Sequence, residues 1–211
     1  MKKLQLILII IFTITTIEYF AQPLPPNAIL KDFRPFSTPR TNGRPGEVYR
    51  IDKKGKKYIV EDVRAIKAKK SEEGTLVGRM YFTSDELLTM LNLEFDRIKT
   101  IPVEVSIDQA LREYNEQSAV DRVLYENEKI RELVVDENSS YFIIRETISS
   151  KKVTFRFSPD IVKRIKKGAQ ALKEIKSTEE LDFPYEIQKK FKQNKRIFYL
   201  DQRIKIEPYE D

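Results

Sequence analysis

Apolar residues recur at every second position over several stretches after Gly46, and this period constrains the fold more than any other feature of the chain. A period of two places alternate side chains on opposite faces of a β-strand. Residues 47–52 and 56–68 carry this pattern on either side of a turn in which Gly55 can adopt positive φ. Residues 77–83 continue it. The first part of the chain is therefore predicted to form three antiparallel strands.

A short helix is predicted to follow these strands. Thr83 and Glu86 have the spacing of a capping box, in which each side chain bonds the other residue's backbone N–H. Three leucines then recur at helical spacing and give the segment one apolar face. The order over residues 47–105 is therefore strand, strand, strand, helix.

The later chain repeats this order in its sequence pattern. Three further strands are predicted, at residues 129–136, 141–148 and 152–158. A helix is predicted to begin at Ser158, with Pro159 at a position where its missing N–H costs nothing. A helix over 106–128, with Ser106 and Gln109 at capping-box spacing, is predicted to join the two units.

These elements predict an α+β fold of antiparallel strands with packed helices. Residues 183–194 are predicted to add a last helix, and residues 196–206 a last strand. The two halves, 47–105 and 128–211, match over about ten positions where a strand enters a capped helix. Two related β-β-β-α units are one interpretation of this match, and coincidence is the other.

An apolar run of about fourteen residues, 4–17, opens the chain after two lysines. A membrane-spanning helix needs about twenty apolar residues, and Glu18 interrupts any extension of this run. Residues 1–21 are therefore predicted to be a secretory signal peptide. Ala21 fits the last position before the cut, but Tyr19 is large for the third-last position. An uncleaved N-terminal membrane anchor remains the alternative.

Residues 22–46 contain six of the ten prolines and are predicted to form an extended linker. The mature chain of about 190 residues is long enough for one ordinary domain, or for two small ones packed together. The predicted organisation is therefore a signal peptide, a proline-rich linker and one α+β domain at residues 47–211.

The chain contains no histidine and no cysteine. It therefore lacks the commonest general base, thiolate nucleophiles and disulfides. No cofactor or metal motif is present, so no cofactor is expected. Serine with lysine can act as a nucleophile pair, and residues 149–152 are two serines followed by two lysines. They fall in a predicted turn, where serine is favoured for backbone reasons, so the turn is the preferred explanation. Two carboxylates that are distant in sequence can still meet in space, so a carboxylate-dependent hydrolase remains an alternative.

The positive charge is concentrated in the last third of the chain. Residues 22–150 hold 21 Lys and Arg against 22 Asp and Glu, whereas residues 151–211 hold 16 against 10. A basic face attracts anionic partners. Nine basic side chains are the candidate binding residues for such a partner: Lys163, Lys166, Lys167, Lys173, Lys189, Lys190, Lys192, Lys195 and Arg196.

These observations together favour a noncatalytic role. The predicted protein is an exported binding or assembly module of the bacterial cell envelope, periplasmic or secreted after signal cleavage, whose partner is another envelope protein. The alternatives are a binder of anionic polymer or lipid headgroups through the basic last third, and the hydrolase. Nucleic acid is not an expected partner. An open sheet edge or apolar patch favours protein partnership, whereas converging acids in a cleft favour the enzyme.

Overall fold

The computed structural model describes residues 30–62, 67–95, 100–134, 139–165 and 185–204. The predicted signal peptide, residues 1–21, lies outside the described residues. So do three of the predicted basic residues, Lys166, Lys167 and Lys173.

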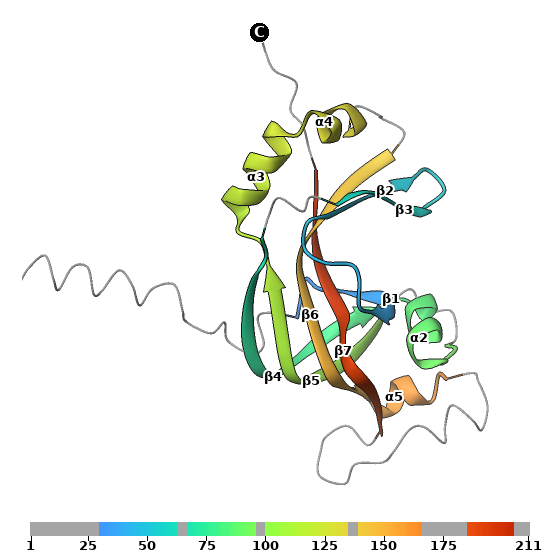
Figure 1. The fold of residues 1–211 in the computed structure, drawn as a ribbon. Helices are drawn as coiled ribbons and strands as arrows, with labels where there is room; N and C mark the ends of the chain where they lie inside the picture. Colours follow the sequence, from blue (N-terminus) through green and yellow to red (C-terminus); the bar gives the residue numbers. More distant parts are fainter. Residues whose placement is uncertain (1–29, 63–66, 96–99, 135–138, 166–184, 205–211) are drawn as a thin grey trace, which may run out of the picture.

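The described residues form seven strands and four helices, arranged as Figure 1 shows. In chain order they are β1 (Arg34–Arg40), β2 (Glu47–Asp52), β3 (Lys57–Asp62), β4 (Lys69–Phe82), α2 (Ser84–Leu91), β5 (Ile101–Tyr114), α3 (Gln117–Glu126), α4 (Glu128–Val134), β6 (Ser139–Phe157), α5 (Pro159–Val162) and β7 (Tyr185–Arg203).

Strand β6 is the centre of one antiparallel sheet. Strand β7 pairs along one side of it, from Phe142 to Phe157. Two strands share the other side, because β2 pairs with the first five residues of β6 and β5 pairs from Glu146 to Arg156. Strand β3 lies outside β2, β4 outside β5, and β1 outside β7. Among the described residues, β1, β3 and β4 are therefore the outer strands of the sheet.

The main hydrophobic core lies between the sheet and helix α2. Phe82, Phe155 and Phe198 are fully buried there, and the ring of Phe82 meets the other two edge-on at centroid distances of 6.0 and 6.4 Å. Helix α2 contributes Leu87 and Leu91. A second, smaller cluster packs α3 and α4 against the opposite end of the sheet. Burial of these apolar side chains is the dominant favourable contribution to folding.

The prediction of an α+β fold is wrong, because the described chain is mostly antiparallel β-sheet with four short helices. The largest error falls in the predicted joining helix, whose first part is the strand β5. Alternate buried residues continue along β5 to Ile107, and then Gln109 adopts positive φ (48°) and shifts the alternation. The shift gives Ile107, Ala110, Leu111 and Tyr114 a helix-like spacing of three, four and seven residues.

The second predicted β-β-β-α unit is also not formed. Residues 141–148 and 152–157 belong to one continuous strand, β6, where two strands and a turn were predicted. Helix α4 replaces the strand predicted at 129–136, and β7 replaces the helix predicted at 183–194. An Asn127 carboxamide oxygen accepts a bond from the Ile130 N–H, and this cap favours the helix at α4.

The predictions for residues 47–92 agree better with the structure. Strands β2 and β3 form the expected hairpin, with Gly55 at φ 79° in its turn. Both bonds of the capping box between Thr83 and Glu86 are present at the start of α2.

Part of the predicted linker, Arg34–Arg40, forms strand β1 and pairs with β7. No helix in the described ranges is both long and apolar enough to span a bilayer.

Bulges interrupt the pairing of β4 with β5 and of β6 with β7 at one level of the sheet, while β5 and β6 stay in register. Gly74 in β4 and Gln109 in β5 have positive φ, and the pairing of β6 with β7 shifts between Ser150 and Lys152. On β7, the four residues 191–194 lie opposite the single residue Lys151 of β6, because Ser150 pairs with Lys195 whereas Lys152 pairs with Lys190. Bulges bend a strand and increase its twist. We call this line of bulges the crease of the sheet.

Ser150 satisfies backbone groups that the crease leaves unpaired. Its hydroxyl is fully buried, accepts a bond from the Lys152 N–H at 2.9 Å and lies within bonding distance of the Asp108 carbonyl. Ser150→Ala is expected to lower the free energy of unfolding by about 1–3 kcal/mol, because those groups lose a buried partner. Urea denaturation measures the loss, with Ser140→Ala in the same strand as control. Equal losses for the two variants would contradict this role.

Candidate functional site

The β2–β3 hairpin ends in a tight, lysine-rich turn. The Asp52 carboxylate accepts bonds from the backbone N–H groups of Lys54 and Lys56, both at 2.9 Å, and Gly55 supplies the positive φ. The bond from the Lys56 N–H, and to a smaller extent the bond from the Lys54 N–H, hold the pKa of the Asp52 carboxyl below its ordinary value. The only carboxylate of the turn is therefore directed at its own backbone.

An aromatic cluster lies on the sheet beside this hairpin. Tyr49 on β2 stacks on Phe142 of β6 at a centroid distance of 5.3 Å, and Phe36 on β1 lies 4.6 Å from Tyr199 of β7. Ile144 completes the buried part of the cluster. Four strands thus contribute to one apolar patch that is separate from the main core.

Buried polar contacts hold the two tyrosines in this cluster. The Tyr49 hydroxyl donates to the Asp201 carboxylate, which also lies 3.7 Å from the Arg34 guanidinium. Burial, and then the bond to Asp201, raise the pKa of the Tyr49 hydroxyl far above its ordinary range. Burial likewise raises the pKa of Tyr199. Both phenols are therefore neutral hydrogen-bonding groups at physiological pH.

Lys57, the first residue of β3, places its ammonium against these rings. Its Nζ lies 3.4 Å from the ring centroid of Tyr49 and 4.6 Å from that of Tyr199, within the range of a cation–π interaction. Desolvation by these rings, and then the positive charge of Arg40, lower the pKa of Lys57 to about 8. The residue as a whole is exposed, although its ammonium packs against the two rings.

The titration of Lys57 can be measured directly. A pH series of NMR spectra is expected to give a midpoint of about 8 for the Lys57 side chain. Arg40→Met is expected to raise that midpoint, because it removes a repulsive charge and frees Glu47, which Arg40 contacts at 3.0 Å. Since the unfolded value is 10.5, this group makes the folded protein more stable as pH rises from about 8 toward 10.5. A midpoint near 10.5 in both proteins would contradict the desolvated environment.

Strand β3 exposes an open edge beside the aromatic cluster. Within the described residues it pairs only with β2. Lys57 lies opposite Ile51 and Ile59 opposite Tyr49, so both side chains share the face that carries the cluster. Ile59 is 57% exposed, which is high for an apolar side chain at a sheet edge. We call Lys57, Ile59 and the adjoining aromatic cluster the β3-edge site.

The outer edge of β4 differs from that of β3. Tyr81 is 61% exposed there, but two register shifts around Gly74 interrupt β4. Strand β3 has one register shift against β2, between Ile59 and Glu61, and it leaves Lys57 to Ile59 in regular pairing. Lys70 of β4 also forms a 3.4 Å ion pair with Glu113. Bulges are a usual means of protecting a sheet edge from further pairing. The β3 edge has fewer of them and keeps Lys57 to Ile59 in regular pairing, so it is the better candidate for binding another strand.

The candidate basic residues that the structure describes lie beside α5 and on β7 and do not all have the same surroundings. Lys163 directly follows α5, and Lys189, Lys190, Lys192, Lys195 and Arg196 lie on β7. Arg196 is committed to an internal ion pair, since its Nε and Nη2 donate to the Glu113 carboxylate at 2.8 and 2.5 Å. Lys190 and Lys192 are exposed.

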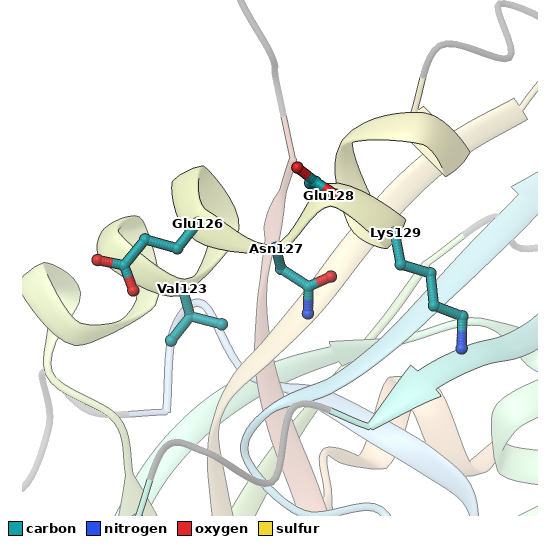
Figure 2. A pocket seen from close by; sticks show the side chains of 5 residues that line it. All are labelled: Val123, Glu126, Asn127, Glu128 and Lys129. Carbon is teal, nitrogen blue, oxygen red and sulfur yellow. The ribbon is translucent and has the colours of Figure 1, made fainter.

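Two hollows lie elsewhere on the described part of the chain. Figure 2 shows the pocket of about 470 Å³ at the α3–α4 junction, where Asn127 caps α4 between Val123 and Lys129. A second hollow of about 420 Å³ follows the crease and is lined by Gln109, Lys151 and Asn194, among others. The described residues contain no group of three acidic side chains placed to hold a metal ion. The serines at 149 and 150 bond backbone carbonyls of β5.

The β3-edge site was not among the sites predicted from the sequence. Its signal was the density of charge in the hairpin turn, where four of the five residues from Lys53 to Lys57 are lysines. The aromatic partners of Lys57 come from strands far apart in sequence, so no spacing rule could have joined them.

Comparison with known proteins gives no family. No family model matches this chain, and no curated protein sequence matches it. Among solved structures, the chain is similar to a bacterial gasdermin from Bradyrhizobium tropiciagri. The two are 10% identical with a TM-score of 0.41, over 81% of this chain and 81% of that chain. A similarity at this level carries no functional assignment.

Proposed function

We propose that this protein is a noncatalytic binding or assembly module of the bacterial cell envelope that binds a partner protein at the β3-edge site. In this proposal the partner contributes an extended segment, which pairs with the open edge of β3 as an additional strand. Such strand addition obtains affinity from main-chain hydrogen bonds and specificity from alternate side chains.

The observation that carries the proposal is the exposed apolar edge of β3. Ile59 stands on an outer strand that pairs on one side only among the described residues. An exposed apolar edge is an aggregation hazard unless it is used. The aromatic cluster beside it adds apolar surface that the incoming segment can cover.

The two sheet edges provide a matched test. Ile59→Lys and Tyr81→Lys each place one charge on an edge residue of similar exposure. The tagged protein and both variants are used to capture partners from the native envelope, and the bound proteins are identified by mass spectrometry. The proposal expects that a specific partner is lost with Ile59→Lys and retained with Tyr81→Lys. Loss of the partner with Tyr81→Lys alone, or with neither variant, would overturn the assignment to β3.

Export is part of this proposal and rests on the apolar run at residues 4–17, followed by Glu18. Sequencing the N-terminus of the protein purified from its native source tests it. A mature chain that begins at Gln22 supports export with cleavage. An intact initiator methionine on a chain that fractionates with the membrane supports the anchor instead.

A further inference from the structure

We propose that the segment bound at the β3 edge is an acidic stretch of the partner protein, with an apolar residue and an acidic residue two positions apart. This inference rests on the proposed function and adds the chemistry of the partner. It follows from the charges of the hairpin and from the alternation of β3.

The hairpin turn presents uncompensated positive charge. Lys53, Lys54, Lys56 and Lys57 are all exposed. The turn contains one acid, Asp52, and its carboxylate is bonded to the backbone of the turn. The ion pairs found within the described residues leave all four lysines out. An acidic partner would therefore find cations that do not first have to break an internal ion pair.

The alternation of β3 specifies the order of the partner's side chains. Lys57 and Ile59 are two residues apart and lie on one face. In a paired strand, the side chains opposite them are also two residues apart on that face. An acidic side chain is favoured opposite Lys57 and an apolar one opposite Ile59. Further acids beyond the first reach the lysines of the turn.

The environment of Lys57 strengthens this preference. Its ammonium is partly desolvated by the rings of Tyr49 and Tyr199. The nearby charges from other elements are Arg34 and Arg40 on β1, Glu47 on β2 and Asp201 on β7, and the two carboxylates are already engaged by Arg40 and Arg34. A carboxylate brought to Lys57 would meet a cation in a low-dielectric setting, where the attraction is stronger than in water.

A protein segment suits this surface better than a lipid headgroup or a phosphate polymer. The lysines adjoin an open strand edge, whose alternating backbone N–H and C=O groups match the spacing of another extended backbone. Ile59 adds an apolar contact in the same row. A lipid surface or a polyanion would use the charges and leave the edge unpaired.

Two short peptides test the inference with the purified full chain. The acidic peptide Ac-TVTETE-NH2 carries the apolar and acidic residues at alternate positions, and Ac-TVTKTK-NH2 is its basic counterpart. Fluorescence anisotropy of labelled peptides is expected to show at least about tenfold tighter binding of the acidic one at low salt, with the difference falling as salt rises. Equal binding of the two peptides, or binding of neither, would overturn the inference.

Variants separate this inference from the proposed function. Lys53→Glu with Lys54→Glu is expected to weaken binding of the acidic peptide about tenfold, whereas Lys190→Glu with Lys192→Glu on β7 leaves it unchanged. Both pairs are exposed, so both double variants are expected to fold. An equal effect of the two would overturn the assignment to the hairpin. If the peptides fail while the envelope partner is still lost with Ile59→Lys, the acidic segment is wrong and strand addition stands.

Anionic surfaces provide the competing outcome. Phosphatidylglycerol vesicles and polyphosphate are measured against the same protein and against Ile59→Thr, which removes the apolar side chain without adding charge. The inference expects that Ile59→Thr weakens binding of the acidic peptide. Vesicle or polyphosphate binding tighter than peptide binding, and unaffected by Ile59→Thr, would show a general polyanion surface and would overturn the inference.

Discussion

Arg196→Met is expected to lower the free energy of unfolding by about 3 kcal/mol. Arg196 lies on β7 and reaches the Glu113 carboxylate on β5, so its side chain bridges across β6. Glu113 is 7% exposed. Removing the arginine leaves this carboxylate buried, with Lys70 at 3.4 Å as its remaining cationic contact. A buried charge without its partner costs far more than a surface ion pair contributes.

Urea denaturation measures the loss, and Lys190→Met on the same strand serves as control. Lys190 is exposed, so its replacement is expected to change stability by less than about 0.5 kcal/mol. Adding Glu113→Leu to Arg196→Met is expected to recover part of the stability, because no unpaired charge then remains. Wild-type stability in Arg196→Met would show that Arg196 is not structural and would return it to the candidate anion-binding residues.

Phe155→Ala is expected to have the largest effect on stability, a loss of about 3–5 kcal/mol. Phe155 is fully buried on the central strand, paired with Val105 on β5 and Ile187 on β7. Its ring meets Phe82 edge-on, so alanine removes both the apolar contact and the aromatic pair. The neighbours belong to three paired strands and can fill the resulting cavity only in part.

Phe155→Leu provides the matched control, because it keeps most of the volume and is expected to cost less than about 1.5 kcal/mol. Tyr81→Ala, on the exposed face of β4, is expected to have little effect on unfolding. A loss below about 1 kcal/mol for Phe155→Ala would contradict a close-packed core at this position.

The sequence was sufficient to predict those elements whose structure is decided by residues close together in the chain. The hairpin around Gly55 and the capping box of α2 each depend on residues within a few positions of one another. The same local rules failed where strands bulge. A residue such as Gln109, with a left-handed backbone, changes the phase of alternation, and the apolar spacing then imitates a helix.

The strand β7 shows the second limit. Its residues 185–194 carry charged side chains at many positions, and their apolar residues fit a helix as well as a strand. Pairing with β6 decides in favour of the strand, and that contact is not visible in local sequence. The β3-edge site could not be predicted for the same reason, because its aromatic rings belong to β1, β2, β6 and β7. Only the lysines of the turn were open to prediction.

Hydrogen exchange of the backbone amides tests the central claim most directly. The protein is compared alone and in complex with the partner that Ile59→Lys fails to capture. Strand addition predicts that amides within Lys57–Asp62 exchange at least about tenfold more slowly in the complex, while those of residues 75–82 in β4 are unchanged. Unchanged exchange in β3, with protection along β4 or on the helices, would contradict binding at the β3 edge.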